Sequence, residues 1–195
     1  MEKILTFLLL VMLLSIVQVP TAQAWTGKTH SDVVEQVYYS LPGDVQQKLS
    51  LSEMRNGSDD PDLKFFDYSY HRYPASYNKA IYWLDEGEAA YKKGDYRQAS
   101  YCFGVASHYI SDSFAAAHCV KGYTGYHTLY ELQAVLLNPH IIFTSGNLKS
   151  LLKNGRLSGE YSWNRWMITR SDSYVQNDLD QATSASYVAI LGRVN

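Results

Sequence analysis

The sequence predicts an all-α fold, a single compact multi-helix domain, from three observations. Apolar residues recur at helical spacing in several segments, whereas the alternating pattern of β-strands is scarce. The chain from residue 25 to residue 195 is long enough for one domain with a sizeable core. In addition, the 17 basic and 19 acidic residues nearly balance, which argues against a protein that coats nucleic acid.

The first 24 residues have the pattern of a secretory signal peptide. A short charged start precedes an apolar run from Ile4 to Val17, and Ala22-Gln23-Ala24 is a small-residue cleavage motif. The apolar run is short for a membrane span, although an uncleaved anchor is the alternative. We therefore expect cleavage after Ala24, a secreted or extracytoplasmic protein, and one domain over residues 25–195.

Five segments are predicted to be helical. The first opens with a Ser-Asp cap signal, the second ends at Gly94, and the third follows at once, which indicates a helix–turn–helix pair. The five helices are expected over residues 31–41, 76–94, 95–118, 126–137 and 177–194. Residues 55–74 and 137–147 contain Gly, Pro and Asp or Asn, and they are expected to be loops. Long irregular loops in compact domains are often functional.

The chain contains two cysteines, Cys102 and Cys119. They flank the segment richest in histidine, but their spacing is a poor fit to a zinc finger. In an exported protein they could form a single disulfide, and buried free thiols are the alternative.

Histidines pair with carboxylates at a spacing of four residues. His108 and Asp112 share one face of a predicted helix, and His127 and Glu131 repeat the arrangement on the next. Imidazole nitrogen and carboxylate oxygen are ligands that zinc accepts. One such pair also fits a simple helix-stabilising contact, but two pairs with further histidines supply more ligands than one zinc needs. These further histidines are His30, His71 and His118.

Taken together, these residues resemble the zinc-dependent phospholipase C family, which includes bacterial phosphatidylcholine-hydrolysing enzymes and the catalytic domain of clostridial alpha-toxin. The family's H-x3-D-x5-H helix and its following H-x3-E helix match residues 108–118 and 127–131. Its GS-x-x-PD loop matches residues 57–62. With Trp25-x4-His30 and "SWNRW", the resemblance covers nearly all of the chain after the leader.

The resemblance implies up to three zinc ions. In this family the mature chain begins with a Trp whose free α-amino group and carbonyl oxygen bind zinc, so cleavage after Ala24 would complete the site. The implied ligands are Asp62, His71, His108 and Asp112 for one ion, the Trp25 terminus, His30 and Asp112 for a second, and His118, His127 and Glu131 for the third. Asp59 and Asp60 lie in the same loop and could replace Asp62 as the ligand.

The resemblance further implies hydrolysis of glycerophospholipids to diacylglycerol and a phosphorylated head group, with Asp62 and Asp112 in the catalytic site. Clustered zinc ions suit this reaction because they acidify bound water and neutralise phosphoryl oxygens. Asp62 could instead be the general base for the attacking water. The expected partner is a phospholipid, with transient contact to a membrane surface and no stable nucleic-acid complex.

Two other functions stay open. The zinc-dependent single-strand nucleases share the fold, the N-terminal Trp and most ligands, although they more often carry Asp at the position of Glu131 and are longer. A non-catalytic, zinc-binding secreted module is the second. It is motivated by short intervals from Asp62 to His71 and from His118 to His127, which indicate trimmed loops around the cleft.

Overall fold

The regular elements of the structure are all helices, as the sequence predicts. The computed structural model describes residues 25–120 and 125–194, and no strand occurs within these ranges. The expected signal peptide, residues 1–24, lies outside them. In chain order the elements are α2 (Gly27–Ser40), α3 (Gly43–Gln46), α4 (Leu51–Asp60), a π-helical turn η1 (Pro61–Phe65), a 3₁₀ turn η2 (Tyr68–Tyr70), α5 (Ala75–Lys92), α6 (Tyr96–Asp112), α7 (Ala116–Cys119), α8 (His127–Ala134), α9 (Leu148–Thr169) and α10 (Asp172–Val194).

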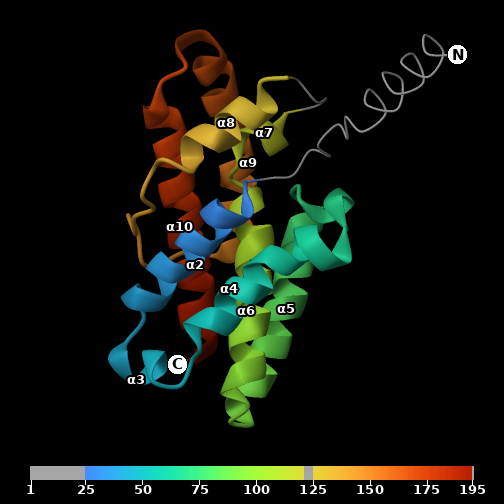
Figure 1. Cartoon of the computed structure of the whole chain (residues 1–195), viewed down its shortest axis with the longest axis vertical. Coiled ribbons are helices and arrows are strands. Elements are labelled where there is room, and N and C mark those ends of the chain that lie inside the picture. The colour runs from blue at the N-terminus through green and yellow to red at the C-terminus, as the bar shows by residue number, and fades with distance from the viewer. Residues whose placement is uncertain (1–24, 121–124, 195) are drawn as a thin grey trace, which may run out of the picture.

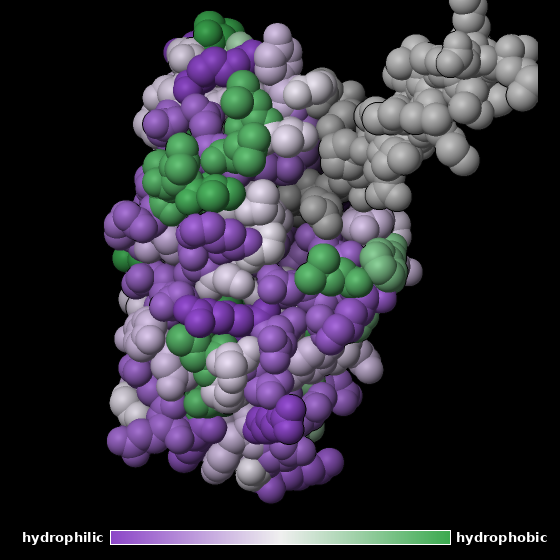
Figure 2. Space-filling model, in the orientation of Figure 1, coloured by the Kyte–Doolittle hydropathy of each residue, from purple (hydrophilic) through white to green (hydrophobic). Residues whose placement is uncertain are grey.

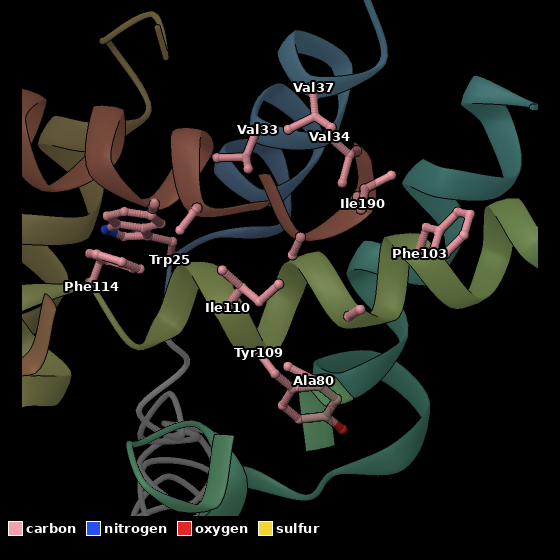
Figure 3. Close-up of a cluster of buried hydrophobic side chains, with 14 of the residues drawn as sticks. Trp25, Val33, Val34, Val37, Ala80, Phe103, Tyr109, Ile110, Phe114 and Ile190 are labelled. Carbon is pink, nitrogen blue, oxygen red and sulfur yellow. The ribbon is translucent and has the colours of Figure 1, made fainter. Parts of the chain in front are cut away.

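Helix α6 lies at the centre of the molecule and is covered by its neighbours (Figure 1). Every residue from 102 to 112 is buried, as expected of a helix surrounded by others. Figure 3 shows Val33 of α2 and Ile190 of α10 on one side of α6, and Tyr109 with Ala80 of α5 on the other. His108 and Asp112 therefore project from a helix that is enclosed along its whole second half.

Two glycines let α4 and α6 approach until their backbones touch. A Cβ atom on Gly104 would lie 2.0 Å from the carbonyl oxygen of Met54, and one on Gly57 would lie 2.1 Å from that of Tyr101. Only glycine leaves room for such an approach. The contact brings the end of α4, and the GS-x-x-PD segment that follows, against the histidine face of α6.

The helix expected over residues 95–118 is two helices, so this expectation is wrong in its extent. Helix α6 ends at Asp112, where the amides of Ser113 and Phe114 bond at 3.1 and 3.0 Å to carbonyls three residues back. Such bonds close a last helical turn. The chain then turns into α7, which places His118 on a different element from Asp112.

The expectation of a loop over residues 55–74 is also wrong in part, because much of this segment is helical. Ser50 caps α4 by accepting a hydrogen bond from the amide of Glu53, and the helix continues through residue 60. Pro61 then opens η1, which ends at Phe66 with a left-handed φ of 52°. A proline at the start of a helical turn costs no hydrogen bond, so it does not force a loop. π-Helical turns of this kind occur frequently at functional sites.

Helix α9 was not among the helices expected, because much of its buried face consists of small residues rather than apolar ones. Gly155 and Gly159 are buried there against Phe114 and Cys119. Helix α10 begins five residues earlier than expected, whereas residues 137–147 contain no helix, as predicted.

The two cysteines do not form a disulfide: Cys102 and Cys119 are separate buried thiols. Among the described residues, none of the helices has both the length and the apolar character needed to cross a membrane.

Candidate metal centre

Eight side chains expected as metal ligands are buried and lie in three groups at one end of α6. They come from six parts of the chain: α2, η1, the turn after η2, α6, α7 and α8. The groups are His30, His108 and Asp112; Asp62, His71 and His108; and His118, His127 and Glu131. Within each group the donor atoms lie within 4.8 Å of one another.

The carboxylate of Asp112 lies between the first two groups and contacts histidines of both. Its Oδ1 lies 3.3 Å from Nε2 of His30, while its Oδ2 lies 2.8 Å from Nδ1 of His71 and 3.2 Å from Nε2 of His108. The two oxygens of one carboxylate thus face different histidines. This is the arrangement in which a carboxylate can bridge two cations.

Asp62 completes the second group. Its Oδ1 lies 3.7 Å from Nδ1 of His71 and 3.9 Å from Nε2 of His108. Two ligands bound tetrahedrally to one zinc at about 2.1 Å lie roughly 3.4 Å apart. The observed spacings are close to that value.

Neighbouring aspartates do not occupy the same position. Asp60 instead accepts hydrogen bonds from Lys64 Nζ at 2.9 Å and from the Tyr101 hydroxyl at 2.8 Å. Asp59 is partly buried near Gly27, and burial raises its pKa. Of the three acids in this segment, Asp62 is the one whose oxygen faces two histidines.

The third group lies between α7 and α8. Nε2 of His127 is 2.8 Å from Oε1 of Glu131, one helical turn away, and the ring of His118 lies 5.0 Å from that of His127. The exposed fractions of these three residues are 7% or less. A basic and an acidic ligand thus face each other in an enclosed space.

Two of the histidines are oriented by hydrogen bonds to the ring nitrogen that points away from Asp112. Nδ1 of His108 lies 2.7 Å from the carbonyl oxygen of Ser58, and Nδ1 of His30 lies 3.0 Å from the hydroxyl of Ser111. Each bond leaves Nε2 facing Asp112. Metal-binding histidines usually use their second nitrogen in this way.

Asp67 supports His71 in a similar manner. Its Oδ1 lies 3.6 Å from Nε2 of His71, and its Oδ2 accepts hydrogen bonds from Tyr109 at 2.8 Å and Lys79 at 2.9 Å. Asp67, Ser58 and Ser111 are not among the site residues that the sequence predicts. Asp67 stands four residues before His71, which is the same spacing that marks the other histidine–carboxylate pairs.

Donor atoms at the centre of the groups are buried without hydrogen-bond partners. They include Nε2 of His30 and of His108, both nitrogens of His118, Oδ1 of Asp62 and both oxygens of Asp112. The short contacts around Asp112 lack hydrogen-bond geometry. Because nearly all buried polar atoms in native proteins are satisfied, such a concentration fits a set of metal ligands.

The pKa values show the cost of this burial. Burial raises the pKa of Asp62 to about 6 and that of Glu131 to about 9, and it lowers the pKa of His118 to about 3. Burial also acts to raise the pKa of Asp112, but the surrounding histidines hold it well below its usual value. Bound cations would offset this cost by stabilising the carboxylates and the neutral imidazoles.

Trp25 lies two residues before Gly27, where α2 begins, and the first turn of α2 includes His30. Its side chain is fully buried in the core cluster that also contains Phe114 (Figure 3). Thr26 is the extended N-cap residue of α2, and its carbonyl oxygen accepts a hydrogen bond of 3.1 Å from the amide of His30, which closes the first helical turn. The main-chain atoms of Trp25 are the ones that the resemblance assigns to zinc.

One of three comparisons with known proteins gave a match. A family model described as "Zinc dependent phospholipase C" matches residues 29–187, which include all eight grouped side chains. Neither the curated proteins nor the solved structures gave a significant match. The match covers most of the chain, and the chain therefore belongs to the zinc-dependent phospholipase C family.

Proposed function

We propose that the protein is a secreted zinc-dependent phospholipase C, which hydrolyses glycerophospholipids to diacylglycerol and a phosphorylated head group. The observation that carries the proposal is the Asp112 carboxylate, whose two oxygens face His30 on one side and His71 and His108 on the other. Membership in a zinc-dependent phospholipase C family supports the reaction class.

Three zinc positions are proposed. Asp62, His71, His108 and Asp112 would hold one ion; the Trp25 terminus, His30 and Asp112 a second; and His118, His127 and Glu131 a third. Zinc bound there would supply acidified water and neutralise phosphoryl charge. Ser58, Ser111 and Asp67 would hold the histidine rings in place.

The exposed apolar residues of helix α8 favour a lipid substrate over nucleic acid. His127 and Glu131 face the buried third group, whereas Leu129 and Leu132 are 43% and 53% exposed and Leu136, just beyond the helix, is 82% exposed. Figure 2 shows apolar side chains gathered over the part of the molecule where Figure 1 places α8. An exposed apolar surface beside a hydrolytic site suits contact with a membrane surface better than contact with nucleic acid.

The test compares two substrates. Zinc-loaded protein is incubated with vesicles of mixed phosphatidylcholine, phosphatidylethanolamine and phosphatidylserine and, separately, with single-stranded DNA, and release of phosphorylated head groups and of nucleotides is measured. We expect head-group release that is lost in Asp112→Asn and kept in Asp60→Asn, whose carboxylate contacts Lys64 and Tyr101 instead. Nuclease activity without lipid hydrolysis would replace the proposal by the nuclease function. Retained zinc with no activity toward any phosphodiester would point to a binding module.

A further inference from the structure

A cavity of about 180 Å³ opens beside the metal centre and is lined by two arginines. Asp112 and His118 form part of its wall, so a molecule in the cavity would adjoin the first and third groups of ligands. The other lining residues are Arg72, Tyr73, Ser113, Cys119, Val120 and Arg156.

The two arginines reach the cavity from separate parts of the fold. Arg72 directly follows His71, whereas Arg156 belongs to α9 and donates a hydrogen bond of 3.5 Å to the carbonyl oxygen of Tyr73. Glu160 lies 3.6 Å from Nε of Arg156, but both side chains are more than 40% exposed, so this ion pair is weak. Arg72 forms no ion pair with the described residues. Among the lining side chains, the two guanidinium groups thus outnumber the one carboxylate, that of Asp112.

Guanidinium groups select particular ligands. Their planar array of donors binds carboxylate or phosphate through paired hydrogen bonds. A quaternary ammonium such as choline is instead recognised by aromatic faces and repelled by positive charge. A cavity that combines Arg72 and Arg156 beside the reaction centre therefore disfavours choline.

We propose that Arg72 and Arg156 bind an anionic group of the phospholipid head group, other than the scissile phosphate. The substrate class is a glycerophospholipid whose head group carries its own carboxylate or phosphate. This inference rests on the proposed phospholipase C function, and it assigns the two arginines as specificity-determining residues.

The first experiment measures binding by calorimetry to the zinc-loaded protein. O-phosphoserine and phosphoethanolamine are the probes, because they differ only by one carboxylate. We expect phosphoserine to bind about tenfold more tightly. Arg72→Gln and Arg156→Gln should each remove most of that preference, and Arg72→Lys should keep part of it.

Arg97→Gln is the matched control, since Arg97 is exposed, pairs with Glu53 and lines a different cavity. It should leave both affinities unchanged. Equal affinity of the wild type for the two probes would overturn the inference. It would also fail if the variants weakened both probes equally, because the arginines would then act on the phosphate that both contain.

The second experiment measures hydrolysis of short-chain phosphatidylserine and phosphatidylethanolamine as dissolved monomers, which removes any effect of vesicle charge. We expect a higher kcat/KM for phosphatidylserine and loss of the difference in Arg72→Gln. Equal rates in the wild type would contradict the inference and leave the phospholipase C function standing. If phosphatidylcholine is hydrolysed and neither of these lipids is, the inference fails and the phospholipase C function stands. If no phospholipid is hydrolysed, the proposed function fails, and the binding preference still decides what the cavity recognises.

Discussion

Asp112 shows how one residue can set the electrostatics of a whole site. It is fully buried at the end of α6, and three histidines lie within 3.3 Å of its oxygens. An isolated carboxylate at such a depth would be too costly to keep ionised. The histidines hold its pKa well below the usual value, so it stays available as a ligand.

Asp67 allows a test of a positioning role. Asp67→Asn removes the charge behind His71 while leaving the proposed ligands intact, and it should weaken zinc binding by about 10- to 100-fold. Zinc affinity measured by competition with a chelator checks this prediction. Asp85→Asn is the control, because Asp85 is exposed and pairs with Arg193. Unchanged zinc affinity in Asp67→Asn would show that Asp67 does not orient His71.

At the scale of elements, the α4–α6 contact positions the site. Gly104→Ala would place a Cβ atom 2.0 Å from the Met54 carbonyl oxygen, so the helices must separate. We expect a loss of unfolding free energy of about 3 kcal/mol, measured by urea denaturation. Gly192→Ala, in α10 with nothing within 4 Å of the new atom, should instead be neutral or slightly stabilising. Equal stability of the two variants would contradict the close packing.

Asp178 connects three helices. From α10 it accepts hydrogen bonds from Tyr130 of α8 at 2.7 Å and from Ser162 of α9 at 2.8 Å. Burial nevertheless raises its pKa to about 7, although these bonds oppose the shift. Folding therefore favours the protonated acid.

The resulting dependence of stability on pH has a definite sign. Below about pH 4 the acid is protonated in both states and costs nothing; the cost grows as pH rises and is complete above about pH 7. A shift of this size corresponds to about 4 kcal/mol. Urea denaturation of wild type and Asp178→Asn between pH 4 and 8 should show the wild type losing stability relative to the variant. Parallel curves would contradict the raised pKa.

The sequence predicted elements better where large apolar residues mark a buried face. Val33, Val34 and Val37 mark α2 in this way, whereas the glycines of α9 carry no such signal although they are buried. The pairs His108–Asp112 and His127–Glu131 could be anticipated from their spacing, whereas the role of Asp62 and the division into ligand sets followed only from the family resemblance. The supporting bond from Ser58 could not, because it depends on how closely α4 approaches α6.

At the scale of the whole molecule, export and metal binding are linked in the proposed function. The secreted protein should begin at Trp25, and its free terminus should allow up to three zinc ions per chain. A version that retains residues before Trp25 should bind less zinc, because an amide nitrogen is a poor ligand. Intact mass and zinc content of both forms check this prediction. A different first residue, or equal zinc content, would contradict it.

The convergence of six chain segments on one buried centre, in a chain whose two cysteines stay separate, has a further consequence under the proposed secretion. Ions bound there would act as cross-links between residues as far apart in the sequence as His30 and Asp112, much as disulfides do in extracellular domains. A shortage of zinc outside the cell would then lower both the stability of the fold and the catalytic activity. The supply of zinc would decide how long such a protein persists as well as how fast it works.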